Sequence, residues 1–296
     1  MKYQKVLVTG ASGKSGLSAV KALIANGITP RAMVRKEDER AQNLRKLGAE
    51  VVIGDFQDLS SLQAALQDIE AAIFIYPVAE GIVEAAGLFS EVAQVAKLQR
   101  LIHLSVGGAD PYNPSPHLRA QWVAEKVFEW AGLPVTQVRL KVFFLENTFL
   151  HAREVATNKT ISNSFGDLKF GWLTGEEAGK VAISVLLADR FEHEQVICVA
   201  SEAISSFPDF AEILSELLGT KVTYHEISTK EYKVFLTKLA DLGRITYRVV
   251  DHLTSQSSNL KKEVYNTNTI PYKEVVGENP ASVRAFFEKK LDNFRG

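Results

Sequence analysis

The sequence has a single cysteine, Cys198, among 296 residues, and its net charge at neutral pH is only −1. One cysteine cannot form a disulfide within the chain, which fits a reducing compartment. The near-zero charge gives no sign of a polyanion partner, because nucleic-acid binding requires clustered positive charge. No apolar run reaches the roughly 18–20 residues that span a bilayer, and none precedes the first predicted strand. We therefore expect a cytoplasmic protein that binds neither nucleic acid nor membranes.

Several catalytic patterns are absent as well. None of the eight tyrosines is followed by a lysine four residues later, so the Tyr-x-x-x-Lys pair of short-chain dehydrogenases is missing. This absence disfavours an epimerase or reductase of nucleotide sugars. The sequence also has no Gly-x-Ser-x-Gly elbow, which disfavours a serine hydrolase. The six histidines are scattered without paired metal-ligand spacing, so we expect no metal site.

What the sequence does have is a regular alternation of short apolar runs and helical patterns over its first half. Hydrophobic residues make up 46% of the chain, enough for a sizeable core. Strands that are apolar on both faces and separated by helices are typical of a parallel sheet covered on both sides. We therefore predict an α/β fold with a Rossmann-type doubly wound parallel sheet. The expected strands are residues 5–9, 28–35, 50–53, 71–76, 101–106 and 135–140.

The second half of the chain is different. The mixture of helical and strand patterns in this half indicates a smaller α+β lobe set over the open edge of the sheet. The predicted organisation is a Rossmann domain at residues 1–150 and a smaller lobe at residues 151–296, interleaved with the first. In this half we expect helices at 174–187 and 207–218, strands at 195–200 and 221–227, and further helices near 230–242, 245–253 and 281–293.

A glycine-rich loop lies between the first predicted strand and the first predicted helix. Gly10, Gly13 and Gly16 stand where dinucleotide-binding folds hold a pyrophosphate. Such glycines permit the tight turn, let the backbone approach the phosphates and let helix and strand pack closely, while the helix N-terminus presents N–H groups to the anion. We predict a nicotinamide dinucleotide site here; the alternative is a plain tight turn. This prediction makes residues 1–150 an NAD(P)-binding Rossmann domain and residues 151–296 a substrate or partner lobe. The other polar residues of the loop are Ser12, Lys14 and Ser15.

The end of the second predicted strand favours NADP(H) over NAD(H). An NAD enzyme usually carries an acidic residue roughly 20 residues after the glycine loop, but here the strand ends in Arg35 and Lys36. A guanidinium at this place favours the 2′-phosphate of NADP, and Lys14 could assist it; the alternative for Arg35 is a solvated surface charge. At the end of the third strand, Asp55 could accept from the adenine amino group. Phe56 could flank the adenine ring or simply pack in the core.

Motifs at residues 8–16, 33–35, 54–62 and 144–147 together resemble the NmrA-like group of atypical short-chain dehydrogenases. That group contains NADPH quinone oxidoreductases and triphenylmethane reductases, and also dinucleotide-binding regulators of the NmrA type. The resemblance therefore implies an NADP(H)-binding protein, with NAD(H) as the alternative cofactor. The implied activity is hydride transfer from NADPH to a quinone-like or other small electron-poor acceptor. The alternative is a non-catalytic NADP(H) redox sensor.

The resemblance also implies roles for residues at the ends of the predicted strands. The loop from Ser12 to Gly16 would hold the pyrophosphate, and Arg35 would hold the 2′-phosphate. The other implied cofactor-binding residues are Asp55 and Phe56 at the adenine, Tyr76 and Pro77 on the ribose and nicotinamide side, and Phe144, Leu145, Glu146 and Asn147 over the nicotinamide.

The segment 117–125 matches the family's His-x-x-x-Lys helix, but Gln121 stands where the lysine would be. Glutamine can bond the nicotinamide ribose but cannot supply a proton at neutral pH, so the sequence predicts no conventional acid–base assistance. Candidate polar groups near the acceptor are His117, Tyr112 and Ser105, around the turn-rich segment after the fifth strand. Their structural alternatives are a surface position, a turn anchor and a strand-end cap. We expect a small-molecule acceptor as partner, with a homodimer or a regulated protein left open.

Overall fold

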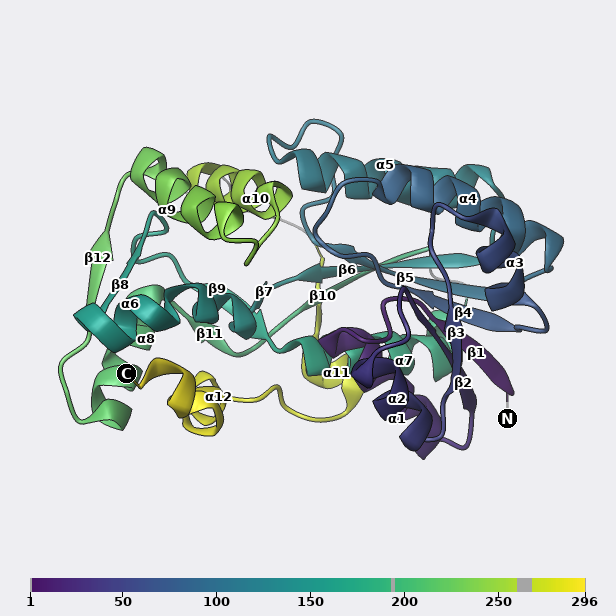
Figure 1. Ribbon diagram of the computed structural model, residues 1–296, viewed down its shortest axis with the longest axis horizontal. Coiled ribbons are helices and arrows are strands. Elements are labelled where there is room, and N and C mark those ends of the chain that lie inside the picture. Colours follow the sequence, from purple (N-terminus) through teal and green to yellow (C-terminus); the bar gives the residue numbers. More distant parts are fainter. Residues whose placement is uncertain (1, 193–194, 260–267, 296) are drawn as a thin grey trace.

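The computed structural model describes residues 2–192, 195–259 and 268–295, and its centre is one eight-stranded sheet (Figure 1). Every neighbouring pair in this sheet is parallel, in the order β13-β10-β6-β5-β4-β1-β2-β3. The predicted doubly wound parallel sheet is therefore confirmed. Its strands are β1 Lys5–Val8, β2 Thr29–Val34, β3 Glu50–Ile53, β4 Ala71–Phe74, β5 Arg100–Val106, β6 Val135–Lys141, β10 Val196–Ala200 and β13 Ile270–Pro271.

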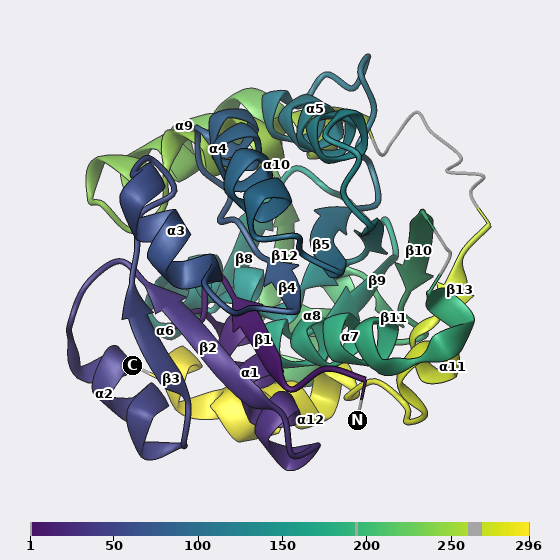
Figure 2. The same cartoon turned by 90° about the vertical axis from the view of Figure 1, so that its right-hand side faces the viewer.

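Helices cover both faces of the sheet (Figure 2). Successive side chains of a strand point to opposite faces, so Val6 and Val8 of β1 enter one buried cluster and Leu7 enters the other. This double burial explains why the strands are apolar at nearly every position. One face carries α1 Lys14–Ala25, α2 Glu39–Lys46, α7 Gly175–Leu187 and α11 Tyr272–Val276, and the other carries α3 Leu59–Leu66, α4 Ile82–Val95 and α5 Pro116–Trp130.

Part of the second half of the chain belongs to this central layer. Strands β10 and β13 extend the sheet beyond β6, and α7 packs on α1. The contact between these helices is so close that a Cβ added at Gly179 would lie 2.3 Å from the carbonyl oxygen of Ser15. The sheet edge that we expected to find open under a separate lobe is thus occupied by strands of that half. The division near residue 150 stays a prediction.

The remaining elements form a second body with its own core of aromatic side chains, including Phe165, Trp172, Phe207, Phe210 and Phe287. Two small sheets run through it, β11-β9-β7 and β12-β8. Within the described residues, no helix is long and apolar enough to cross a membrane. The strands of this body are β7 Phe143–Phe144, β8 Thr160–Asn163, β9 Phe170–Leu173, β11 Ile204–Ser205 and β12 Thr223–Glu226, and its helices are α6 Ala152–Asn158, α8 Phe207–Leu218, α9 Thr229–Asp241, α10 Tyr247–Asn259 and α12 Val283–Lys290.

Candidate cofactor and acceptor site

The strand order reverses between β1 and β4, so the chain leaves these two neighbours toward opposite faces of the sheet. In open parallel sheets, ligands bind in the crevice that such a reversal leaves at the carboxyl ends of the strands. The glycine-rich loop follows β1 at this point, and Tyr76 and Pro77 lie two and three residues beyond the last residue of β4. The fold therefore brings the predicted pyrophosphate loop to the expected position.

The glycines of this loop are required by its geometry. Gly10 has a φ of +59°, in the left-handed region, and a Cβ there would lie 3.0 Å from the carbonyl oxygen of Ile75. A Cβ at Gly16 would lie 2.3 Å from the carbonyl oxygen of Gly10. Helix α1 begins behind this turn with Gly13 at its N-cap, with no capping side chain and no acidic residue in its first turn. An uncapped helix N-terminus behind an approachable backbone fits a diphosphate.

Arg35 directly follows β2 and is exposed. Two arginines nearby are already occupied, because Arg40 pairs with Asp38 at 2.6 Å and Arg45 pairs with Glu37 at 2.5 Å. Arg35 itself has no ion-pair partner among the described residues. Its guanidinium is thus available to an anionic ligand.

Asp55 and Phe56 follow β3 at the same edge of the sheet. The carboxylate of Asp55 is exposed, and its Oδ1 accepts a hydrogen bond from the backbone N–H of Gln57 at 3.0 Å. Phe56 is half-buried, with its ring centroid 5.3 Å from that of Tyr76 and 5.1 Å from that of Phe74. Phe56 therefore packs on the core and also borders the edge where the adenine is expected.

Tyr76 lies in the loop that follows β4. Its hydroxyl donates a hydrogen bond to the carbonyl oxygen of Glu80 at 2.7 Å. Burial raises the pKa of Tyr76 above its ordinary value, so this phenol stays protonated at neutral pH. Tyr76 therefore shapes the loop, while Pro77 beside it is exposed.

The segment from Phe144, the last residue of β7, to Asn147 contributes residues of different kinds. Leu145 is fully buried in the aromatic core of the second body, whereas Phe144 and Asn147 line a pocket. The carboxylate of Glu146 accepts from the backbone N–H of Gly175 at 3.1 and 3.2 Å and lies 3.5 Å from Nζ of Lys14. Lys14 is thus paired with Glu146.

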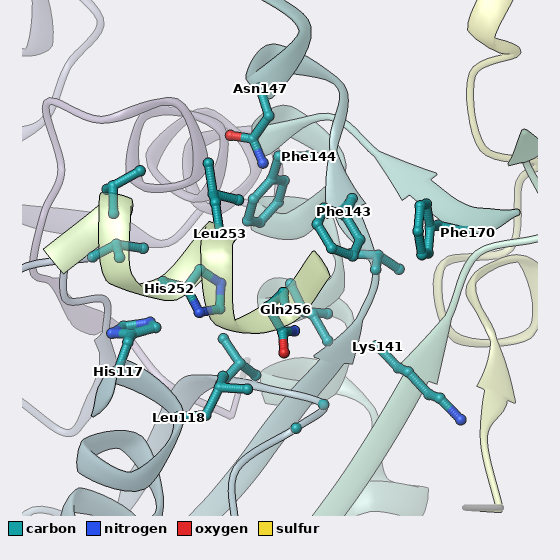
Figure 3. Close-up of a pocket in the computed structure, with 18 of the residues that line it drawn as sticks. His117, Leu118, Lys141, Phe143, Phe144, Asn147, Phe170, His252, Leu253 and Gln256 are labelled. Carbon is teal, nitrogen blue, oxygen red and sulfur yellow. The ribbon is translucent and has the colours of Figure 1, made fainter. Parts of the chain in front are cut away.

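The pocket has a volume of about 430 Å³ and lies at the carboxyl ends of β5 and β6 (Figure 3). Its walls are mostly apolar and aromatic. Such a concave, apolar space with few polar groups is typical of a small-molecule site. The apolar lining residues include Val78, Val106, Leu118, Val142, Phe143, Phe144, Phe170 and Leu253, and the polar ones are His117, Lys141, Asn147, Lys169, His252 and Gln256.

Two histidines meet in the wall of this pocket. The rings of His117 on α5 and His252 on α10 are 5.1 Å apart between centroids and stand edge to face. Burial lowers the pKa of His117 to about 4, with the charge of Arg248 as a smaller cause. Burial also lowers the pKa of His252 to about 3, assisted by His117. Both imidazoles are therefore neutral at physiological pH.

The structure does not bring the other two acceptor-site candidates to the pocket. Tyr112 is 91% exposed on the turn-rich loop. Ser105 is buried and donates its hydroxyl to Oε1 of Glu125 at 2.6 Å. Gln121 is also buried, in α5, and no hydrogen bond is formed by its Oε1 within the described residues. Of the three acceptor-site candidates, only His117 lines the pocket.

His252, Gln256 and Lys141 are lining residues that the sequence interpretation missed. Lys141 had a usable signal, because it ends a strand of the parallel sheet and strand ends at that edge carry sites. His252 lies in the helix predicted near residues 245–253, and Gln256 lies three residues beyond that range. Nothing in the local pattern shows which part of the fold this helix covers. The contact between α10 and α5 joins two helices that are far apart in the sequence, so no local pattern reveals it.

Comparison with known proteins places these features in context. Residues 2–265 match the NmrA-like family. An NAD(P)H azoreductase of Xenophilus azovorans is 24% identical over 78% of this chain and 80% of its own length. The structure of a triphenylmethane reductase from Citrobacter sp. superposes with a TM-score of 0.82 at 21% identity, covering 97% of this chain and 99% of that one. An NADPH-dependent quinone oxidoreductase from Escherichia coli, complexed with NADPH, gives 0.81 at 21% identity, with the same coverages of 97% and 99%.

Proposed function

Because this chain belongs to the NmrA-like family, we propose that it is an NADP(H)-dependent oxidoreductase that reduces a small, electron-poor acceptor in the aromatic pocket. The observation that carries the proposal is the position of the glycine-rich loop after β1, where the strand order reverses. The pocket lies beside it, because Val78 of the loop after β4 lines the pocket. The azoreductase, dye reductase and quinone reductase named above support the same class of reaction.

The residues fit a dinucleotide phosphorylated on its adenosine ribose. The backbone around Gly13 would hold the diphosphate and Arg35 the 2′-phosphate, with Asp55 and Phe56 at the adenine. Asn147 lines the pocket and would hold the carboxamide side of the nicotinamide. When bound, NADPH supplies a hydride from its nicotinamide ring, and the protein orients the acceptor and limits the access of water.

Protons need a separate source. A quinone or azo acceptor gains two electrons and one proton as the hydride, and a second proton completes its reduction, whereas a cationic triarylmethane dye needs the hydride alone. Neither His117 nor His252 is charged at neutral pH, given their lowered pKa values. We therefore assign the second proton to water rather than to either imidazole. This arrangement suits acceptors whose reduction needs no protein acid, such as quinones or azo and triarylmethane dyes.

One observation favours a second candidate function, a non-catalytic NADP(H) sensor. The pocket helix α10 and the residues just before it contact the loop after β4: Oγ1 of Thr246 donates to the carbonyl oxygen of Val78 at 2.8 Å, and Arg248 lies 3.3 Å from Glu80. Cofactor that rearranges this loop would move α10, and α10 could signal to a partner.

Steady-state oxidation of NADPH with a panel of quinones, azo dyes and triarylmethane dyes tests the proposal. We expect turnover with at least one class, with one NADPH consumed per two-electron reduction. Gly16→Ala should abolish it, because the added Cβ would collide with the carbonyl oxygen of Gly10. Tight NADPH binding without turnover across the panel would contradict the proposal and favour the sensor.

A further inference from the structure

Ser115 and His252 come from opposite halves of the chain and meet at the pocket wall. Ser115 is the N-cap of α5, and His252 lies in α10. The Oγ of Ser115 is 3.0 Å from Nδ1 of His252, across a sequence separation of 137 residues. Figure 3 shows the His252 ring in the pocket wall between His117 and Gln256. The sequence alone gave neither residue a partner.

The direction of the hydrogen bond follows from what Ser115 must satisfy. Its hydroxyl is fully buried and already accepts the backbone N–H of Leu118 at 3.4 Å. A buried hydroxyl proton needs an acceptor, and Nδ1 of His252 is the acceptor within reach. The Ser115 hydroxyl therefore donates to Nδ1. A neutral imidazole that accepts at Nδ1 carries its proton on Nε2.

The opposite edge of the His252 ring is open. No hydrogen bond is made by Nε2 to any described residue, and His252 lines the pocket. The neighbouring His117 is 1% exposed, and its Nδ1 also lacks a partner in the described part of the chain. His252 is half-buried, and the buried nitrogen of this pair that lacks a partner within the described residues is Nδ1 of His117. An unpartnered N–H donor on the wall of an apolar pocket indicates a ligand with a matching acceptor atom.

We propose that Ser115 and His252, with the His117 ring packed edge to face against His252, form a hydrogen-bonding subsite that selects acceptors bearing a carbonyl-type oxygen. His252 donates from Nε2 to that oxygen, while Ser115 is a positioning residue that holds the ring and its tautomer. The flat aromatic body of the acceptor lies against Phe143 and Phe144 on the same pocket. The inference rests on the proposed function, because it takes this pocket as the acceptor site.

Equilibrium binding of two probes of nearly equal shape tests the subsite without turnover. Menadione carries two carbonyl oxygens, and 2-methylnaphthalene has the same fused rings without them. Saturating NADP⁺, which cannot donate hydride, keeps menadione oxidised. We expect the wild-type protein to bind menadione about tenfold more tightly, the difference made by one good hydrogen bond.

Variants at His252 separate the hydrogen bond from the shape of the pocket. His252→Phe should lower the preference to about twofold or less, whereas His252→Gln keeps a donor near Nε2 and should retain most of it. Ser115→Ala should lower the preference partly and shift the ¹⁵N resonances of His252 away from those of a pure Nε2–H tautomer. His225→Phe is the control, since His225 is exposed outside the pocket and its loss should change nothing.

The proposal is overturned if His252→Phe keeps the full preference for menadione over 2-methylnaphthalene. It is also overturned if the wild-type protein shows no such preference. If His252→Phe does not fold, the wild-type preference and the His252→Gln and Ser115→Ala variants still decide. Failure of the proposed function gives a different result. A protein that prefers menadione in binding but oxidises no NADPH with any acceptor keeps the subsite and loses the reductase activity.

Discussion

The Nζ atom of Lys14 lies 3.5 Å from Oε1 of Glu146, so an ion pair joins the glycine-rich loop to the segment that follows β7. The same carboxylate accepts from the N–H of Gly175, the first residue of α7. Lys14 also lies over the ring of Phe149, 5.2 Å from its centroid. The glycine-rich loop and the segment after β7 are therefore linked by the Glu146 carboxylate and by the contact of Lys14 with Phe149.

Removal of Lys14 should cost little stability. The lysine side chain is 58% exposed, so the attraction is screened by water and Lys14→Met should lower the free energy of unfolding by less than about 1 kcal/mol. Glu146→Ala should cost more, because it also removes the acceptor for Gly175. Urea denaturation of both single variants and of the double variant gives the coupling free energy between Lys14 and Glu146. A coupling above about 2 kcal/mol would contradict the description of this pair as solvent-screened.

Gly16→Ala should destabilise the protein by about 2–4 kcal/mol, because a Cβ would lie 2.3 Å from a backbone oxygen that cannot move freely. Gly87→Ala is the matched control, since Gly87 lies in α4 with nothing within 4 Å of its added Cβ. That variant should stabilise the protein by about 0.5–1 kcal/mol. Chemical denaturation measures both. Equal stabilities for the two variants would mean that the loop is looser than described.

Glu125 should be among the most sensitive carboxylates of the described fold. It is fully buried, accepts from Ser105, and receives Nε of Arg139 at 3.0 Å. Glu125→Gln leaves the arginine without its counter-charge and should cost about 3–5 kcal/mol. Glu129→Gln in the same helix breaks a partly exposed pair with Lys126 and should cost less than about 1 kcal/mol. A similar loss for both, measured by thermal and urea unfolding, would argue against a buried ion pair.

Stability should depend on pH through the two pocket histidines. The pKa of His117 is lowered to about 4 and that of His252 to about 3, both below the ordinary 6.5. Between pH 6.5 and about 4, the unfolded chain therefore binds protons that the folded protein excludes, and the free energy of unfolding falls as pH falls. Above about pH 7 this contribution is constant.

The double variant His117→Phe/His252→Phe isolates this effect. Urea denaturation at several pH values should show a decline for the wild-type protein on the order of a few kcal/mol from pH 7 to pH 4.5. The decline should be smaller in the variant, although His103, whose pKa burial also lowers, remains in it. If the free energy of unfolding fell equally with pH in the wild-type protein and the double variant, the two imidazoles would titrate normally in the folded protein.

The sequence was most informative where structure depends on local spacing. Strands β1 to β6 and the glycine loop follow from apolar runs and helix signals that lie within a few residues of each other. Strand β10 was recognised as a strand, but its place beside β6 was not, because partner choice depends on packing far along the chain. The same limit hid His252, whose partner Ser115 is 137 residues away. Tyr112 was a candidate for the acceptor site, but its side chain is exposed. The local sequence of a loop does not show which way an aromatic side chain points.

We propose that the first strand-to-helix junction holds a nicotinamide dinucleotide whose 2′-phosphate is recognised by Arg35. The most direct test is titration of NADPH and NADH against the wild-type protein, Arg35→Glu, and the control Arg45→Glu, whose arginine is paired with Glu37 on the same surface. We expect wild type and control to prefer NADPH, and Arg35→Glu to lose about 1.5–3 kcal/mol of that preference. An unchanged preference in Arg35→Glu, or no binding of either dinucleotide to the wild-type protein, would contradict the account.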